Sequence, residues 1–293
     1  MPELPEVETV RRGLAPFVEG ARIEAVTLFR PDLRFPFPPG FADALMGRTV
    51  VTTGRRAKYL LFHLSDGALW LAHLGMTGAF WVNDTALEEP SRRFRSEAGA
   101  RHVHFSARLR HPERGAVSLY YGDPRRFGFM AHFGPSAPNP YLDLLGPEPL
   151  GNALNADFLG RAFMGKRSPV KSVLLDQRVI AGLGNIYVCE ALHIAGIAPA
   201  RIAGSLATKT GKPRPALMAL PGAIRTVLED AIAAGGSTLR DFRNADGRPG
   251  YFQHNFLVYD REGEACLKPD CPGTVKRIVQ AGRSSFFCPV CQR

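Results

Sequence analysis

The chain has 293 residues, of which 45% are hydrophobic, so it can bury a sizeable core and is long enough for two domains. Its formal net charge of +10 favours a polyanionic partner, because basic side chains replace the counterions around phosphates; the alternative is a basic protein without such a partner. No apolar run reaches the ~20 residues of a membrane span, and the N-terminus lacks the pattern of a signal peptide, so we expect a cytoplasmic protein without a membrane partner.

The first part of the chain, up to residue 134, is predicted to be one helix followed by short strands. Val7, Val10 and Leu14 recur at helical spacing and predict a helix over residues 2–18. Apolar and β-branched runs bounded by Gly, Pro and Asp then predict strands at 23–29, 49–53, 59–64, 69–73, 103–105, 117–121 and 127–132. This series is typical of an antiparallel β-sandwich, and the polar stretch 86–101 is predicted to be a mobile loop.

The composition changes after residue 134. Residues 135–151 are rich in Pro and Gly, and we place the interdomain linker at 135–154. Helical patterns dominate from about 155 to 235, including a helix over 169–177, a Gly-containing turn and a second helix that starts at Asn185. Asn185 is its predicted N-cap, and such a helix start can bind a phosphate; the alternative is an ordinary helix pair in which Asn185 only caps. Cys189, on the apolar face, is predicted to be a core residue.

Four of the five cysteines lie in the last 28 residues, at Cys266, Cys271, Cys288 and Cys291. Two close pairs of thiolates can converge tetrahedrally on one zinc ion. Between the pairs, β-branched and aromatic residues flank an Ala-Gly turn, so we predict a basic β-hairpin held by metal. Two disulfides are the alternative, although nothing else in the sequence indicates a secreted protein.

Several segments together resemble the formamidopyrimidine-DNA glycosylase family, bacterial enzymes that excise oxidised purines. They are PELPEVE at 2–8, RAKY at 56–59, HLGM at 73–76, DPRRFG at 123–128, LLDQ at 174–177, GNIY at 184–187 and the cysteine hairpin. The resemblance spans nearly the whole chain and implies an α+β fold. Its parts would be an N-terminal helix with an antiparallel β-sandwich at 1–134, a helix-two-turn-helix domain at 155–255 and a zinc β-hairpin at 256–293. It also implies a monomer that acts in base excision repair.

The catalytic residues implied by the resemblance lie mainly at the N-terminus. Removal of Met1 would leave Pro2 with a secondary amine, and a terminal amine has a pKa of roughly 8, so part of it is unprotonated near neutral pH. By resemblance, Pro2 attacks the sugar C1′ atom and forms an iminium, and the strand is then cleaved by β,δ-elimination. Glu3 corresponds to the acid–base residue, Glu6 to a supporting carboxylate and Lys58 to a lysine that holds a phosphate beside the lesion. Taken alone, Pro2 would be better explained as a helix-start proline, and the other motifs reverse that interpretation.

The resemblance implies further contacts with DNA at His73, Met76, Arg125, Arg126, Phe127, Asn185 and Arg283. A nucleotide that is flipped out of the duplex leaves a gap, which Met76, Arg125 and Phe127 would fill. The other residues would lie against the sugar–phosphate backbone. The implied partner is therefore double-stranded DNA that contains oxidised bases or abasic sites, and the implied cofactor is one structural Zn²⁺ per chain.

Two features depart from the family pattern. Four residues separate Cys266 from Cys271 where the family typically has two, a spacing that zinc sites tolerate. Residues 86–101 also resemble an insertion, whereas 235–241 resemble the family loop that closes over the damaged base. Two alternatives remain: the related endonuclease VIII type, which favours oxidised pyrimidines, and a zinc-dependent DNA-binding protein without catalysis, which would retain Met1.

Overall fold

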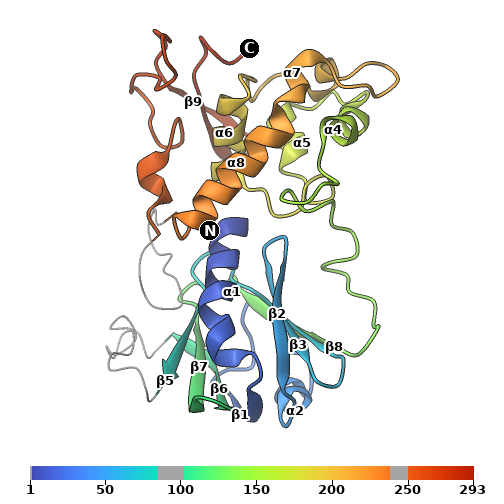
Figure 1. Cartoon of the computed structure of the whole chain (residues 1–293), viewed down its shortest axis with the longest axis vertical. Helices are drawn as coiled ribbons and strands as arrows, with labels where there is room; N and C mark the ends of the chain where they lie inside the picture. The colour runs from blue at the N-terminus through green and yellow to red at the C-terminus, as the bar shows by residue number, and fades with distance from the viewer. Residues whose placement is uncertain (1, 85–101, 238–249) are drawn as a thin grey trace. The chain divides into compact units, whose positions relative to one another are not determined.

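The computed structural model describes residues 2–84, 102–237 and 250–293, and it contains two compact units (Figure 1). The first unit comprises the residues up to Asp143 together with Ala234–Tyr251, and the second comprises Leu144–Ala233 together with Phe252–Arg293. The stretch 86–101 and most of the stretch 235–241, both predicted as loops, lie outside the described residues. The first unit therefore includes a short segment from late in the sequence.

The first unit is built on two four-stranded antiparallel sheets. One has the order β1-β6-β7-β5, and the other has the order β2-β3-β4-β8. Their strands are β1 (Arg22–Leu28), β2 (Val50–Arg56), β3 (Tyr59–Leu64), β4 (Leu69–His73), β5 (Ala79–Asp84), β6 (Val103–His111), β7 (Gly115–Gly122) and β8 (Phe129–Phe133). The predicted antiparallel sandwich is confirmed, and β3 and β4 have the predicted boundaries.

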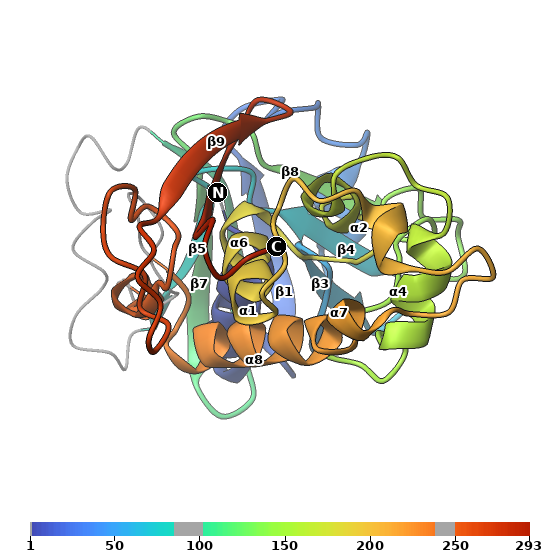
Figure 2. The same cartoon turned by 90° about the horizontal axis from the view of Figure 1, so that it is seen from above.

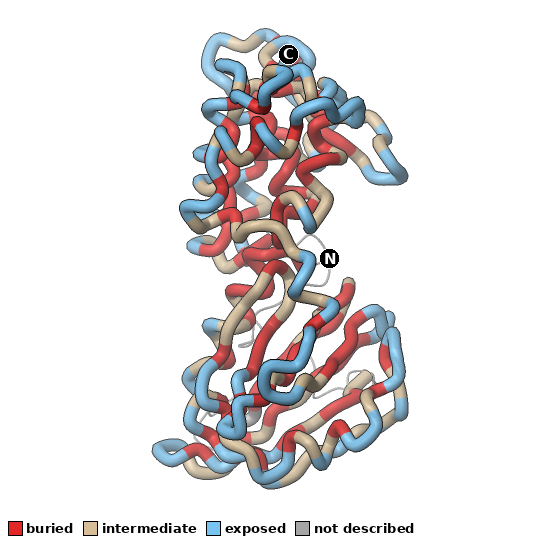
Figure 3. The backbone as a smooth tube through the Cα atoms, turned by 90° about the vertical axis from the view of Figure 1, so that its right-hand side faces the viewer, coloured by how far each residue is buried: buried red, intermediate tan, exposed pale blue. Residues whose placement is uncertain are grey.

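One hydrophobic core fills the space between the two sheets. Trp70 of β4 stacks on Phe62 of β3 with ring centroids 4.0 Å apart. From the other sheet, Phe105 lies 5.2 Å from Trp70, and Phe80 lies 6.0 Å from Phe62. Buried positions recur along these strands (Figure 3). Burial of these aromatic side chains, together with the aliphatic residues of the same core, supplies the hydrophobic driving force for this unit.

Two helices cover parts of this core. Helix α1 (Leu4–Val18) buries Val7, Val10 and Leu14, which are the residues whose spacing predicted it. It packs against β2, β3 and β5, and Figure 1 shows it beside the strands. The short helix α2 (Phe41–Leu45) was not predicted, because one helical turn leaves too short a pattern.

The strand predictions differ from the structure at three places, and one of them is β6, which continues to His111 instead of ending at residue 105. Strand β5 was missed, since its apolar run Ala79–Val82 is only four residues long before two polar residues follow. Strand β8 begins at Phe129 rather than at Phe127, so Phe127 lies in the preceding loop and is 44% exposed. Phe127 is therefore presented on a loop rather than packed in a strand.

The second unit is helical, as predicted, and ends in a β-hairpin. Its α-helices are α4 (Ala156–Phe163), α5 (Val170–Leu174), α6 (Asn185–Ile194), α7 (Pro215–Met218) and α8 (Leu220–Ala233), with 3-10 helices η2 (Ala203–Leu206) and η3 (Phe252–Asn255). Helices α6 and α8 pack side by side, as Figure 2 shows. Nearly every side chain of α6 is buried, including Cys189 as predicted. Among the described helices, none has the length and apolar character needed to cross a membrane.

The helix pair differs from the prediction at two points. Helix α5 ends at Leu174 instead of residue 177, because the Gln177 side chain donates to the carbonyls of Leu175 and Leu183 and accepts the N–H of Gly182. These bonds favour a turn over a continued helix. The N-cap of α6 is Gly184, and Asn185 is its first residue.

Candidate functional site

The start of α1 holds three buried residues that the sequence singled out, Pro2, Glu3 and Glu6. Glu3 is the N-cap of the helix, and the Oε2 atom of Glu6 accepts its backbone N–H at 2.8 Å. The Oε1 atom of Glu6 accepts the backbone N–H of Ser237 at 2.8 Å and its hydroxyl at 3.2 Å. Glu6 thus ties the helix start to a segment 231 residues away in the same unit.

This arrangement places a buried carboxyl group directly beside Pro2. Pro2 directly precedes Glu3, whose side chain is only 2% exposed. A buried carboxyl group exchanges protons with a bound reactant rather than with bulk water. Glu6 is also 2% exposed, but its oxygens are occupied by the bonds to Glu3 and Ser237, so it fixes geometry.

A second carboxylate on α1 connects the helix to strand β2. Glu8 accepts hydrogen bonds from Arg11 at 2.8 Å and from Arg12 at 2.8 Å, and it lies 3.4 Å from Arg55 of β2. The pKa of Glu8 lies below its usual value; burial opposes ionisation, but the hydrogen bonds from Arg11 and Arg12 and the nearby charges outweigh it. This ionised carboxylate holds α1 against the strand that leads to Lys58.

Lys58 and His73 lie on neighbouring parts of one sheet. Lys58 is in the two-residue turn between β2 and β3, where Ala57 adopts a left-handed conformation with φ 52°. Tyr59, the next residue, pairs with His73 across β3 and β4, and their rings are 5.3 Å apart. The chain therefore places a cationic side chain and an imidazole at the same end of the sheet.

His73 is neutral at physiological pH, and one tautomer is favoured. Its Nδ1 atom accepts the backbone N–H of Gly75 at 3.0 Å, so its proton lies on Nε2. Burial, followed by the charges of Lys58 and Arg34, lowers the pKa of His73 to about 4. His73 can therefore donate one N–H to an anion without carrying a positive charge.

The loop between β7 and β8 carries Arg125, Arg126 and Phe127, and Asp123 holds it in shape. Asp123 is fully buried and accepts the backbone N–H of Gly128 at 2.8 Å and the hydroxyl of Thr77 at 2.5 Å. These bonds fix both ends of the loop, and the residues between them, Pro124 to Phe127, are exposed to solvent. There the guanidinium of Arg125 lies 4.9 Å from the ring centroid of Phe127.

A glycine lets this loop approach the turn that carries Met76. Gly75 has φ 63°, and a Cβ atom there would come within 2.3 Å of the backbone at Phe127 and Gly128. The hydroxyl of Thr77 accepts the N–H of Arg125 at 3.2 Å. The backbone segments that bear the predicted gap-filling residues Met76, Arg125 and Phe127 are thus adjacent in the first unit.

Asn185 and Arg283 are neighbours in the second unit. Instead of capping α6, Asn185 donates from Nδ2 to the carbonyl of Ser284 at 3.0 Å and lies 3.4 Å from the hydroxyl of Tyr259. Arg283 is exposed and begins β10 (Arg283–Phe287), directly before Ser284. The buried ammonium of Lys171 also donates to the Ser284 carbonyl, at 2.9 Å. Sequence reasoning missed Lys171, although a lysine within the apolar pattern of α5 was a usable signal.

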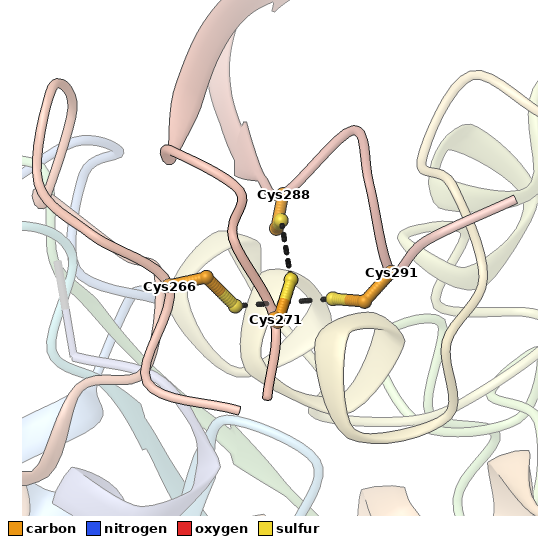
Figure 4. A group of neighbouring side chains, drawn as sticks. All are labelled: Cys266, Cys271, Cys288 and Cys291. Carbon is orange, nitrogen blue, oxygen red and sulfur yellow. Dashed lines mark hydrogen bonds between the residues drawn. The ribbon is translucent and has the colours of Figure 1, made fainter. Parts of the chain in front are cut away.

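The C-terminal hairpin pairs β9 (Lys276–Gln280) with β10 through a turn at Ala281 and Gly282, as predicted. At its base, the sulfur atoms of Cys266, Cys271, Cys288 and Cys291 all lie within 4.8 Å of one another (Figure 4).

These sulfur positions fit one zinc ion. The Sγ atoms of Cys266 and Cys291 are 3.9 Å apart, and those of Cys271 and Cys288 are 3.6 Å apart. Four Zn–S bonds of about 2.3 Å in a tetrahedron place sulfurs about 3.8 Å apart. All five cysteines are free, so the disulfide alternative is wrong. The longer spacing between the first two cysteines therefore leaves the ligand geometry intact.

His193 was not predicted as part of this site. It comes from α6, and its Nε2 and Nδ1 atoms lie 4.0 Å from the sulfurs of Cys266 and Cys291. Its Nδ1 also lies 3.2 Å from the Gln292 side-chain oxygen, which accepts the backbone N–H of Cys288 at 2.8 Å. The zinc site is thus connected to the helix that begins at Asn185. A histidine in the largely apolar sequence of α6 was the available signal.

Three family models match successive parts of the chain. They describe the formamidopyrimidine-DNA glycosylase N-terminal domain over residues 1–130, the H2TH domain of that enzyme over 145–243, and a zinc finger found in FPG and IleRS over 263–293. The zinc-finger match agrees with the four-cysteine site described above.

Known proteins match over the full chain. The chain is 53% identical to a formamidopyrimidine-DNA glycosylase from Chelativorans sp. (strain BNC1) and 55% identical to one from Agrobacterium fabrum, covering 100% of both chains in each case. The crystal structure of MutM (Fpg) from Thermus thermophilus matches with a TM-score of 0.80 and 40% identity, over 99% of this chain and 98% of that chain. A complex of Lactococcus lactis Fpg with DNA that contains an abasic site matches with a TM-score of 0.82 and 31% identity, over 100% of both chains.

Proposed function

Because this chain belongs to the formamidopyrimidine-DNA glycosylase family of DNA repair enzymes, we propose that it excises oxidised purines, such as 8-oxoguanine and formamidopyrimidines, from double-stranded DNA. We propose that it then cleaves the strand as a lyase. The observation that carries this proposal is the buried N-terminal group of Pro2, Glu3 and Glu6. The enzyme would act as a monomer in the cytoplasm, where its thiols stay reduced and bind zinc.

The proposed chemistry begins at Pro2 once Met1 has been removed. The amine nitrogen attacks the sugar C1′ atom, the bond from C1′ to the base breaks, and the base leaves with a proton. Glu3 supplies the proton that opens the sugar ring and accepts protons in later steps. The resulting iminium acidifies the C2′–H bond, so that elimination breaks the bond to the 3′ phosphate. A second elimination breaks the bond to the 5′ phosphate.

Both units would contribute to holding the DNA. In the first unit, Lys58 and His73 would bind phosphates near the flipped nucleotide, while the Met76 turn and the Arg125–Phe127 loop would fill the gap. The close backbone approach at Gly75 supports their joint action. In the second unit, the exposed Arg283 and Asn185 at the start of α6 would bind phosphates together, since the bond from Asn185 to the Ser284 carbonyl places them side by side. We propose 1–134, 155–255 and 256–293 as functional regions, with 135–154 as the linker.

The zinc ion would have a structural role. Bound by Cys266, Cys271, Cys288 and Cys291, it neutralises the thiolates and fixes the base of the hairpin. The hairpin then presents Arg283 from a rigid turn next to Asn185. No step of the chemistry uses the metal.

Borohydride trapping tests the proposed reaction. The protein is incubated with a duplex that carries 8-oxoguanine opposite cytosine, reduced, and digested, and the adduct is located by peptide mass. A covalent sugar at Pro2 is expected. A control protein with a retained N-terminal extension lacks the free amine and should give no adduct and no strand cleavage.

Other outcomes would revise the proposal in specific ways. An adduct only with an oxidised pyrimidine would replace the substrate class with that of the endonuclease VIII type. Cleavage by the extended protein at the normal rate would remove Pro2 from the mechanism. No adduct with any lesion would overturn the proposed catalysis.

A further inference from the structure

The segment between β1 and α2 borders the loop that carries Arg125 and Phe127. The backbone N–H of Arg34 donates to the carbonyl of Gly128 at 3.0 Å, at the end of that loop. Asp32, from the same segment, lies 3.9 Å from the guanidinium of Arg126. None of the sequence motifs that indicated DNA binding includes this segment, yet it is continuous with the proposed DNA-binding surface.

The two arginines of this segment differ in whether a carboxylate binds their guanidinium group. Arg30 is bound by the Asp32 carboxylate, with distances of 2.6 and 2.8 Å. Arg34 is exposed, and over the described ranges its guanidinium has no carboxylate partner. Arginine offers five N–H donors in a fork that matches phosphate. Arg34 therefore keeps this donor set available, whereas Arg30 does not.

Aromatic contacts hold Arg34 close to His73. The Arg34 guanidinium lies 5.4 Å from the ring centroid of Phe35, which is 46% exposed. Phe35 packs edge-on against Phe129 at 5.5 Å, and Phe129 stacks on His73 at 5.5 Å. The Arg34 charge helps to lower the pKa of His73, which agrees with this proximity. A long flexible side chain thus loses little further freedom when it binds an anion.

We propose that Arg34 binds a backbone phosphate of duplex DNA on the edge of the surface formed by Lys58 and His73, and that Phe35 positions its guanidinium. This inference rests on the proposed function, because it extends the DNA-binding surface described there. His73 is a neutral donor, so its bond to a phosphate would release no counterion. Arg34 would add a cationic contact to this part of the surface.

The test compares salt dependences of DNA binding. Arg34→Gln keeps the length and polarity of the side chain but removes its charge. Binding to a duplex with a tetrahydrofuran abasic-site analogue is measured by fluorescence anisotropy over a series of salt concentrations. Loss of one phosphate contact should reduce the slope of log K against log salt by about 0.9. The ratio of the wild-type to the Arg34→Gln binding constant should therefore fall about 3.5-fold between about 50 and 200 mM salt.

Three further variants separate the possible outcomes. Arg108→Gln, an exposed arginine of β6 beside Glu24, is the matched control and should keep the wild-type slope. Arg34→Lys keeps the charge and should show the wild-type salt slope. Phe35→Ala should weaken DNA binding but leave the salt slope unchanged. If Lys58→Gln reduces the slope and Arg34→Gln does not, the inference about Arg34 is overturned and the proposed function stands. If neither changes it, the proposed surface itself fails.

Discussion

Replacement of His73 by alanine should weaken DNA binding without changing its salt dependence. The pKa of His73 is lowered to about 4, so at pH 7 only about one molecule in a thousand carries the proton. For His73 to be half-protonated in the complex at pH 7, a phosphate would have to raise its pKa by about three units, which corresponds to about 4 kcal/mol. The charges of Lys58 and Arg34 oppose that rise. His73 should therefore act as a neutral Nε2–H donor.

The size of the effect follows from the type of bond. A hydrogen bond to a charged acceptor contributes about 1.5–3 kcal/mol, so His73→Ala should weaken binding by about 10- to 150-fold. Lys58→Ala, by contrast, should also reduce the salt slope by about 0.9. The assay is fluorescence anisotropy with the abasic-analogue duplex over a salt series at pH 6, 7 and 8.

The pH series checks the protonation state directly. If His73 took up a proton on binding, the affinity advantage of wild type over His73→Ala would grow as the pH fell from 8 to 6. A constant advantage and an unchanged slope are expected, and either a growing advantage or a slope reduced by about 0.9 would refute the reasoning.

The lowered pKa of His73 also makes the stability of the folded protein depend on pH. The unfolded chain binds the proton more readily, so the His73 contribution is complete above pH 6.5 and is lost as the pH falls toward 4.

Two further predictions concern the scaffold of the site. Gly75→Ala should lower the free energy of unfolding in urea by about 2–5 kcal/mol, since it combines left-handed strain with overlap against the backbone at Phe127. Gly115→Ala is the matched control: it has φ 74° but nothing within 4 Å, so it should cost only about 1–2 kcal/mol, and equal costs would contradict the close approach. Chelation or Cys271→Ser should remove the one zinc per chain found by metal analysis and lower the melting temperature of the second unit. A metal-free protein with an unchanged transition and unchanged DNA binding would contradict the structural role of the zinc site.

Some features of the site depend on contacts that sequence reasoning did not reach. Glu6 was expected to support catalysis, but its bond to Ser237 spans 231 residues and follows from the return of the chain to the first unit. Asn185 was expected to cap its helix, and instead its side chain is directed to Ser284 of the hairpin. In both cases a polar side chain bonds to a residue far away in the sequence, and only the folded chain brings that partner within reach.

The sequence alone was sufficient where the pattern is local. The spacing of Cys266, Cys271, Cys288 and Cys291 identified the zinc ligands, because close cysteine pairs can converge on one metal ion. Short apolar runs located β3 and β4, and helical spacing located α1. The order of the family motifs also indicated the family before the fold was known.

Only the tertiary structure determined how these residues work together. The tautomer and neutrality of His73 depend on Gly75, on burial and on two cations from other elements. The Asp32 carboxylate binds Arg30 and not Arg34, so the guanidinium of Arg34 can donate to an anion. Such properties arise from the geometry of groups distant in sequence and from the low dielectric of their surroundings, which no local pattern encodes.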